Sequence, residues 1–157
     1  MCKFCWLVSL ILAIVVGVGA YKFIYSGEVV ASDDGRQSIL LTQAEKNLVL
    51  LEMRTFLSSV QGITQALVSK DMAQAAAAGK LVGAAAQEAV PASLVGKLPL
   101  AFKKLGFDTH QKFDQLAMDA EALEDPEYTL EQLSVLMQNC VACHAAYRLD
   151  AVETSDQ

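Results

Sequence analysis

The sequence predicts an all-α protein: an antiparallel four-helix bundle preceded by one N-terminal transmembrane helix. Three observations lead to this prediction. Residues 6–25 are almost entirely apolar. Four later stretches repeat apolar residues at steps of three and four, which is typical of amphipathic helices joined by short links. The chain is rich in alanine and has only 3 prolines in 157 residues, which favours helix, and no strand pattern is visible.

The apolar segment 6–25 is interrupted only by Lys22, near its end. Twenty helical residues span roughly 30 Å, the thickness of the hydrocarbon core of a bilayer. Lys22 can extend to the interface, where Trp6 and Tyr25 are also well suited. Residues 1–25 are therefore expected to form a transmembrane anchor.

A cleaved signal segment is the alternative, with residues 18–20 as the cleavage site. Both interpretations export the rest of the chain. Lys3 and Lys22 lie on opposite sides of the segment, so charge does not give its orientation. Cys2 and Cys5 form a Cys-X-X-Cys pair without a following histidine, and we interpret them as two thiols at the start of the anchor.

Residues 26–41 are small, polar and acidic without periodicity, and are expected to form a flexible linker. The domain 42–150 follows, and residues 151–157 form a tail. Its four helices are expected at about 42–69, 72–90, 108–125 and 129–150, with a helical turn at 100–105 stopped by Gly106. The expected N-terminal caps are Thr42 with Glu45, Asp71 with Gln74, Asp108 with Gln111, and Thr129 with Gln132. Pro91 and Pro126 are expected to close the second and third helices.

The region after Ser26 carries 10 basic and 18 acidic residues, a formal charge of −8. This balance argues against nucleic acid as a partner, because nucleic acid is bound by basic patches. An acidic surface suits a basic partner protein but also serves solubility alone. No positioned acid–base pair or nucleophile is visible, so an enzyme is not expected.

The motif with the most chemical content is Cys-X-X-Cys-His, formed by Cys140, Cys143 and His144. Two thiols three residues apart lie on nearly the same helix face and can add to the two vinyl groups of one haem, and the following imidazole can ligate the iron. A zinc site needs four nitrogen or sulfur ligands, and only His110 remains outside the N-terminal pair. The sequence predicts covalent haem c, and a disulfide or thiol redox pair is the alternative. The expected inward face of this helix comprises Leu133, Leu136, Met137, Cys140, Cys143, His144 and Tyr147.

The run from Cys140 to Arg148, near the C-terminus of the last of four helices, resembles the haem-binding motif of the cytochrome c-prime family. The resemblance covers about 42–150 and is specific in the last helix; residues 98–117 and the anchor depart from it. It implies a bundle with one haem near one end, His144 as the proximal ligand, and Tyr147 and Arg148 beside the cofactor. Arg148, four residues after His144, is expected to pair with a haem propionate. A homodimer is a candidate assembly.

The resemblance also implies that a first-helix residue covers the opposite face of the iron. A methionine there would make an electron carrier, and an apolar side chain would leave iron that binds small gases. Met53 lies at roughly the matching position and is the candidate distal ligand, with core packing as the alternative. His110 is the other candidate, although a histidine at a helix start is more often exposed or capping. The remaining side chains singled out are expected to pack in the core: Met72, Met118, Met137, Phe56, Phe102 and Phe113.

These observations predict one-electron transfer by a single-pass protein of the bacterial inner membrane, with its haem domain in the periplasm and redox proteins as partners. Two alternatives stay open. One is a five-coordinate haem protein that binds NO or CO, and the other is a haem-free helical interaction module with a disulfide.

Overall fold

The computed structural model describes residues 3–152, and 78% of the structure is helical. The predicted mainly helical class with an N-terminal apolar helix is confirmed. In chain order the elements are α1 Lys3–Ala20, the π-helical η1 Tyr21–Ser26, β1 Val29–Ala31, β2 Gln37–Leu41, α2 Gln43–Ser69, α3 Met72–Lys80, the 3-10 helix η2 Ala84–Ala89, α4 Ala92–Lys97, α5 Leu100–Leu123, α6 Pro126–Ala146 and β3 Tyr147–Ala151.

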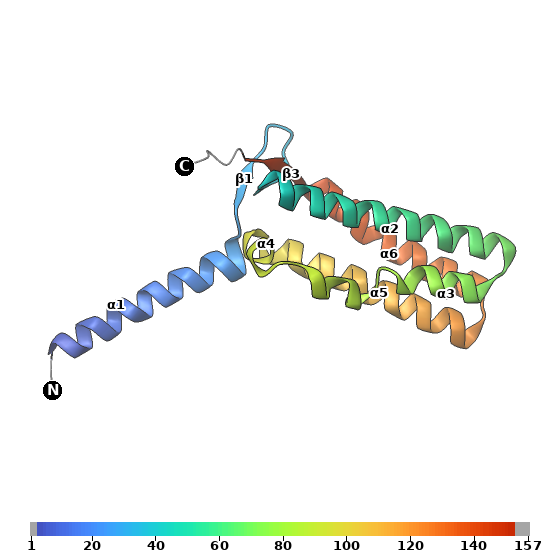
Figure 1. Ribbon diagram of the computed structural model, residues 1–157, viewed down its shortest axis with the longest axis horizontal. Helices are drawn as coiled ribbons and strands as arrows, with labels where there is room; N and C mark the ends of the chain where they lie inside the picture. The colour runs from blue at the N-terminus through green and yellow to red at the C-terminus, as the bar shows by residue number, and fades with distance from the viewer. Residues whose placement is uncertain (1–2, 153–157) are drawn as a thin grey trace.

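Four helices lie along one another and form the body of the protein (Figure 1). α2 contacts α3 and α6, and α5 contacts the same two helices from the other side. α1 projects away from this body, and its side chains are exposed all round. Together with η1, α1 is long and apolar enough to span a membrane, as either an anchor or a signal segment.

The core falls into three buried clusters along the length of these helices. The central cluster joins α2, α5 and α6 and consists of Ile63, Val82, Phe113, Leu116, Leu133 and Leu136. The cluster at the α2–α3 turn is built almost wholly from alanine: Ala66, Met72, Ala75, Ala76, Ala117 and Ala120. The third lies beneath the strands and comprises Ile39, Leu41, Val49, Leu94 and Leu98.

A small mixed sheet is present, so the prediction of no strands is wrong. β1 and β2 lie in the region expected to be linker, and β3 replaces the expected end of the last helix. β2 pairs antiparallel with β1 and parallel with β3. Ile39 and Leu41 of β2 are fully buried against the third cluster, which holds the segment in place. Strands of three to five residues are too short for period-two alternation to stand out from the sequence.

The N-termini of α2 and α3 occur where the sequence predicts them, because each capping signal lies within a few residues. Thr42 and Glu45 form the predicted capping box, with the Thr42 amide donating to the Glu45 carboxylate at 2.8 Å. The Asp71 side chain accepts from the Gln74 amide at 2.9 Å and caps α3. α2 ends at Lys70, whose φ of 57° is left-handed.

Other boundaries differ from the prediction. α3 ends at Lys80 rather than near residue 90. Gly79 in its last turn and Gly83 just after it contribute to the break, because glycine weakens a helix interior. α5 runs unbroken through Gly106, so Asp108 is not a cap. Pro126 begins α6 instead of closing α5, since a proline fits the first turn of a helix and Asp125 caps it.

The C-terminal end of the last helix is also corrected. α6 stops at Ala146, and the next residues form β3 beside β2. Tyr147 and Arg148 therefore lie on a strand rather than on the helix face of His144. Of the expected tail, residues 153–157 lie outside the described residues, as does Cys2; Cys5 is exposed on α1.

Candidate haem-binding cavity

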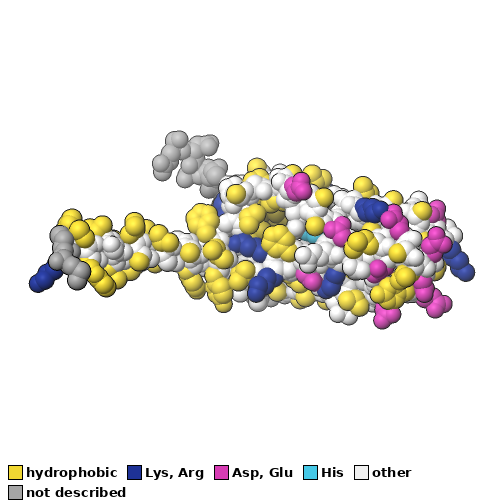
Figure 2. All heavy atoms as spheres, turned by 90° about the horizontal axis from the view of Figure 1, so that it is seen from below, with side chains coloured by type: hydrophobic (Ala, Val, Ile, Leu, Met, Phe, Trp, Pro, Cys, Tyr) yellow, Lys and Arg dark blue, Asp and Glu magenta, His cyan; other side chains and the backbone are white. Residues whose placement is uncertain are grey.

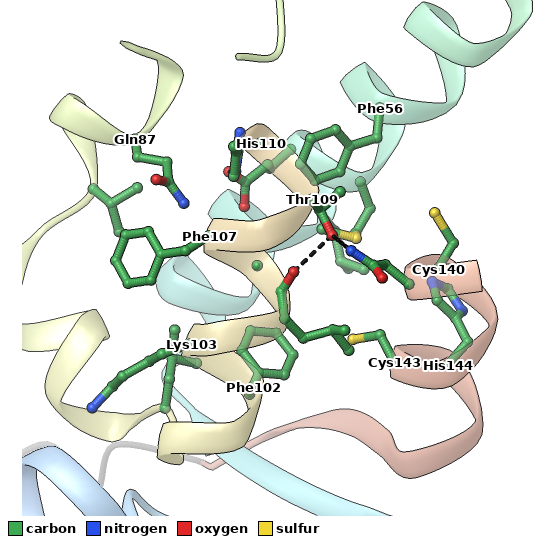
Figure 3. A pocket seen from close by; sticks show the side chains of 18 of the residues that line it. Phe56, Gln87, Phe102, Lys103, Phe107, Thr109, His110, Cys140, Cys143 and His144 are labelled. Atoms are coloured by element: carbon green, nitrogen blue, oxygen red, sulfur yellow. Dashed lines mark hydrogen bonds and ion pairs between the residues drawn. The ribbon is translucent and has the colours of Figure 1, made fainter. Parts of the chain in front are cut away.

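One large cavity, of about 510 Å³, opens between α2, α5, α6 and the segment that contains η2 and α4. Its volume lies in the range of roughly 300–1,000 Å³ typical of cofactor and ligand sites. The wall is mostly apolar and aromatic (Figure 3). Residues from 50 to 144 along the chain therefore line one cavity.

α6 supplies the predicted attachment residues to this cavity. Cys140, Cys143 and His144 all line it, the first two half-buried and the third exposed. Leu136 and Leu133 are buried one and two turns before Cys140, respectively, so Cys140 continues the buried face of α6. The predicted grouping of the two thiols and the imidazole at one site is thus present in the fold.

Both cysteines carry free thiols whose acidity is reduced. Burial raises the pKa of Cys140. Burial, followed by the neighbouring Cys140, raises the pKa of Cys143 to about 11. A redox-active Cys-X-X-Cys pair has the opposite property, a lowered thiol pKa. At neutral pH both groups are protonated thiols in a sheltered position.

α2 forms the wall that includes the predicted distal candidate. Met53 is half-buried and lines the same cavity as His144. Phe56, Leu57 and Val60 continue this wall over the next two turns. Phe56 also stacks on the fully buried Phe113, with ring centroids 5.5 Å apart. The position of Met53 allows either interpretation made from the sequence, ligand or packing.

His110 is not the exposed or capping residue expected from the sequence. It is 2% exposed, and its ring lies 4.9 Å from that of Phe56. Its Nδ1–H donates to the Val82 carbonyl at 2.7 Å, and its Nε2 lies 3.2 Å from Glu52 Oε1. With both ring nitrogens engaged, His110 has no nitrogen free for a metal.

The electrostatics of His110 follow from these partners. Burial by itself lowers its pKa, but the hydrogen bonds to Glu52 and to the Val82 carbonyl, and the charge of Glu52, together raise it above the ordinary value. No sequence signal identifies this arrangement, because Val82 and Glu52 are distant along the chain. His110 is thus a buried polar residue of α5 that is hydrogen-bonded to Val82, in the break after α3, and lies beside Glu52 of α2.

A second polar group fixes the start of the motif and was also missed by the sequence analysis. Asn139, directly before Cys140, is buried and lines the cavity. Its Nδ2 donates to Asp108 Oδ2 at 2.7 Å and to Thr109 Oγ1 at 3.1 Å, and its Oδ1 accepts from Lys112 Nζ at 3.1 Å. The hydrogen bonds from Lys112 and Asn139 lower the pKa of Asp108. This network ties α6 to α5 at the cavity.

Arg148 and Tyr147 do not line the cavity. The Arg148 guanidinium bonds to Asp150, with Nη2 2.9 Å from Oδ1, and lies 3.5 Å from Asp34. Tyr147 packs edge-on against Phe102, with ring centroids 5.3 Å apart. The shared helix face that supported a propionate role for Arg148 is therefore absent. The cations that do line the cavity are Arg54 and Lys103.

The expectation that the other methionines pack in the core holds only in part. Met72 is buried, as predicted. Met118 and Met137 are exposed, and Met137 lies at the edge of the cavity. Apolar spacing of three and four residues places side chains on one helix face. It does not show whether a side chain lies at the centre of the buried face or at its margin.

The residues present fit a haem c. Two thiols and an imidazole with the required spacing face a cavity of cofactor size, and its apolar wall suits a macrocycle with few polar atoms. No family model matches the chain, and no curated protein or solved structure shows significant similarity to it. The function of this protein is therefore inferred from the site itself.

Proposed function

We propose that this protein is a membrane-anchored c-type cytochrome that holds one haem c and transfers single electrons. In this proposal the helices α2, α3, α5 and α6 are a four-helix bundle of the cytochrome c-prime kind. The observation that carries the proposal is the cavity itself: Cys140, Cys143 and His144 line it together with mostly apolar side chains. Bound haem would supply reversible one-electron chemistry between ferric and ferrous iron.

Attachment requires no oxidant. Cys140 and Cys143 would hold the haem through thioether bonds, each made by adding the S–H across one vinyl group with no atom lost. Burial raises the pKa of both thiols, which disfavours the thiolate that disulfide exchange needs. His144, at the end of α6, would be the proximal ligand of the iron.

The other residues of the cavity have supporting roles in this proposal. Phe56 and Phe102 exclude water from the cofactor, which a buried redox centre requires. Arg54 is the cavity-lining cation available to the propionates in place of Arg148, because Lys103 Nζ donates to the Phe23 carbonyl. Met53 is the candidate distal ligand, and a thioether there would favour ferrous iron.

The location follows from α1. We assign it as a retained single-pass anchor in the bacterial inner membrane, with the haem domain in the periplasm and redox proteins as partners. Its apolar surface, exposed along the whole helix, supports this assignment. The acidic surface of the domain suits donors or acceptors with a basic docking face.

Gas binding is the second candidate function, and one observation favours it. Phe56, Leu57 and Val60 line the α2 wall beside Met53, so apolar side chains are available to cover the iron if Met53 packs instead of ligating. The iron would then keep an open position for NO or CO.

The test is the visible absorption spectrum of the full chain, expressed with haem-attachment machinery. We expect a Soret band that persists through denaturation, showing covalent haem. Cys143→Ser should weaken attachment, and the matched control Cys5→Ser should leave it unchanged. A protein without a Soret band would overturn the proposal and leave a haem-free module.

The same spectrum separates the two haem functions. A reduced low-spin spectrum that ignores carbon monoxide, and that becomes high-spin in Met53→Ala, supports electron transfer. A high-spin spectrum shifted by carbon monoxide in the unaltered protein supports gas binding.

A further inference from the structure

The junction between α1 and the helical body is a packed joint. Lys103 Nζ, on the second turn of α5, donates to the Phe23 carbonyl at 2.7 Å and lies 3.3 Å from the Ile24 carbonyl. The amide of Glu28 donates to the Lys97 carbonyl at 2.7 Å. Burial lowers the pKa of Lys103. The end of the apolar helix is thus bound to the corner at which α4 meets α5.

Two glycines allow this close approach. Gly27 has a φ of +66°, and a Cβ there would lie 2.5 Å from the Lys97 carbonyl oxygen. A Cβ at Gly96 would lie 2.6 Å from the Phe23 ring. Neither position has room for a side chain. The corner therefore packs directly against the end of the apolar segment, unlike a domain on a flexible linker.

The depth of this corner follows from the length of the apolar helix. Lys3 and Lys22 flank the span, and at 1.5 Å per residue they are about 28 Å apart, close to the thickness of the hydrocarbon core. Lys22 then lies at the interface. Phe23, the next residue, carries the carbonyl that Lys103 binds. The headgroup layer is roughly 5–8 Å deep on each side, so the α4–α5 corner falls within or against it.

The charge of this corner matches such a surface. Residues 97–104 contain three lysines and no acidic residue, whereas residues 119–131 contain six acidic residues and no basic one. Figure 2 shows most acidic side chains toward the end of the domain away from α1. Among the described residues Lys97 pairs with Glu45, but Lys103 and Lys104 have no acidic partner. Lysines at the start of a helix oppose its dipole, so an external anion would compensate them.

We propose that the corner formed by α4 and the first turns of α5 docks on an anionic phospholipid surface through Lys103 and Lys104. This inference deepens the proposed function, because it requires α1 to be a retained anchor. Four residues of this corner also belong to the cavity wall: Val95, Leu98, Phe102 and Lys103. One wall of the cofactor cavity is therefore held at the headgroup layer, within reach of membrane-embedded redox partners.

The test measures the depth of two spin labels on α5. In the full-length protein, with Cys2 and Cys5 replaced by serine and haem attached, Ala101→Cys places a label at the corner, where Ala101 is exposed. Met118→Cys is the matched control at an exposed position 17 residues further along the same helix, about 26 Å away. Both are reconstituted in vesicles of phosphatidylcholine and phosphatidylglycerol, and collisions with oxygen and with a water-soluble nickel chelate are compared.

We expect the label at 101 to report headgroup depth and the label at 118 to report water. Equal water exposure at both positions would overturn the proposal. In phosphatidylcholine alone, or with Lys103→Gln and Lys104→Gln, the label at 101 should shift toward water. An unchanged depth under both conditions would overturn the assignment to anionic headgroups.

The outcome is separable from that of the proposed function. The Soret band of the same samples reports haem independently of label depth; a sample without haem, labelled after Cys140→Ser and Cys143→Ser, still reports the docking. An intact mass that lacks residues 1–25 would overturn the docking inference while leaving the haem assignment in place.

Discussion

The two ends of the helical body differ in the size of the side chains between the same helices. At the α2–α3 turn, α3 packs on α2 and α5 through alanine and glycine, and Gly79 approaches Ala117 so closely that a Cβ would lie 3.1 Å from its Cβ. At the other end, Phe56 and Phe102 stand around a cavity of about 510 Å³. Small residues close one end and large residues frame a space at the other, so the position of the cavity is set by side-chain volume along α2 and α5.

The largest expected effect separates buried from cavity-edge aromatics on α5. Phe113→Ala should lower the free energy of unfolding by about 3–5 kcal/mol, because the ring is fully buried in the central cluster. Phe107→Ala removes the same aromatic ring from a position that is 50% exposed, and should lower the free energy of unfolding by less than about 1 kcal/mol. Denaturant unfolding of both variants in detergent, followed by circular dichroism, checks the difference. Equal losses would mean that the cavity edge is as well packed as the core.

The next effect concerns the polar network at the cavity end. Asn139→Ala should destabilise the protein by about 1–3 kcal/mol at pH 7, since it leaves Asp108 and Thr109 without a buried partner. The exposed neighbour Gln138→Ala is the control and should be nearly neutral.

The pH dependence of the stability loss in Asn139→Ala gives a second test of the network. Lys112, followed by Asn139, lowers the pKa of Asp108 in the folded state. Its contribution to stability is therefore present above the unfolded value of 3.8 and is lost as the pH falls through the folded value. The cost of Asn139→Ala should shrink below about pH 4. A cost that does not change with pH would show that Asp108 takes no part.

The smallest effect compares two glycines in helices at the opposite ends. Gly106→Ala should stabilise the haem-free protein by about 0.5–1 kcal/mol, because its Cβ would meet nothing within 4 Å and alanine is the better helix former. Gly79→Ala should be neutral or destabilising, since its Cβ would lie 3.1 Å from the Phe113 carbonyl oxygen. Thermal unfolding of both variants in a Cys140→Ala, Cys143→Ala background checks the opposite signs. A stabilising Gly79→Ala would contradict tight packing at the closed end.

Features that are defined by residues close together in the sequence were predictable. The capping box of Thr42 and Glu45 and the cap of Asp71 with Gln74 each span only four residues, and both occur as predicted. The Cys-X-X-Cys-His motif is equally local, so its residues were found from spacing alone. The cavity that these residues line could not be predicted, because its volume depends on side chains from α2, α5 and α6 together.

What the sequence missed depends on contacts between distant residues. His110 binds Val82 and Glu52 across three elements, and Lys103 binds the end of η1. β3 has no strong strand signal of its own, and its pairing with β2 overrides the expected continuation of α6. The same pairing keeps Arg148 out of the cavity wall and ties it to Asp150 and Asp34.

The parallel pairing of β2 with β3 also sets an order of assembly. Gln37 pairs with Tyr147, so this pairing closes a loop of about 110 residues and is expected to form after the local helix contacts. Only Ala145 and Ala146 separate His144 from β3. The late pairing of β3 with β2 therefore holds the end of α6 that carries the Cys-X-X-Cys-His motif.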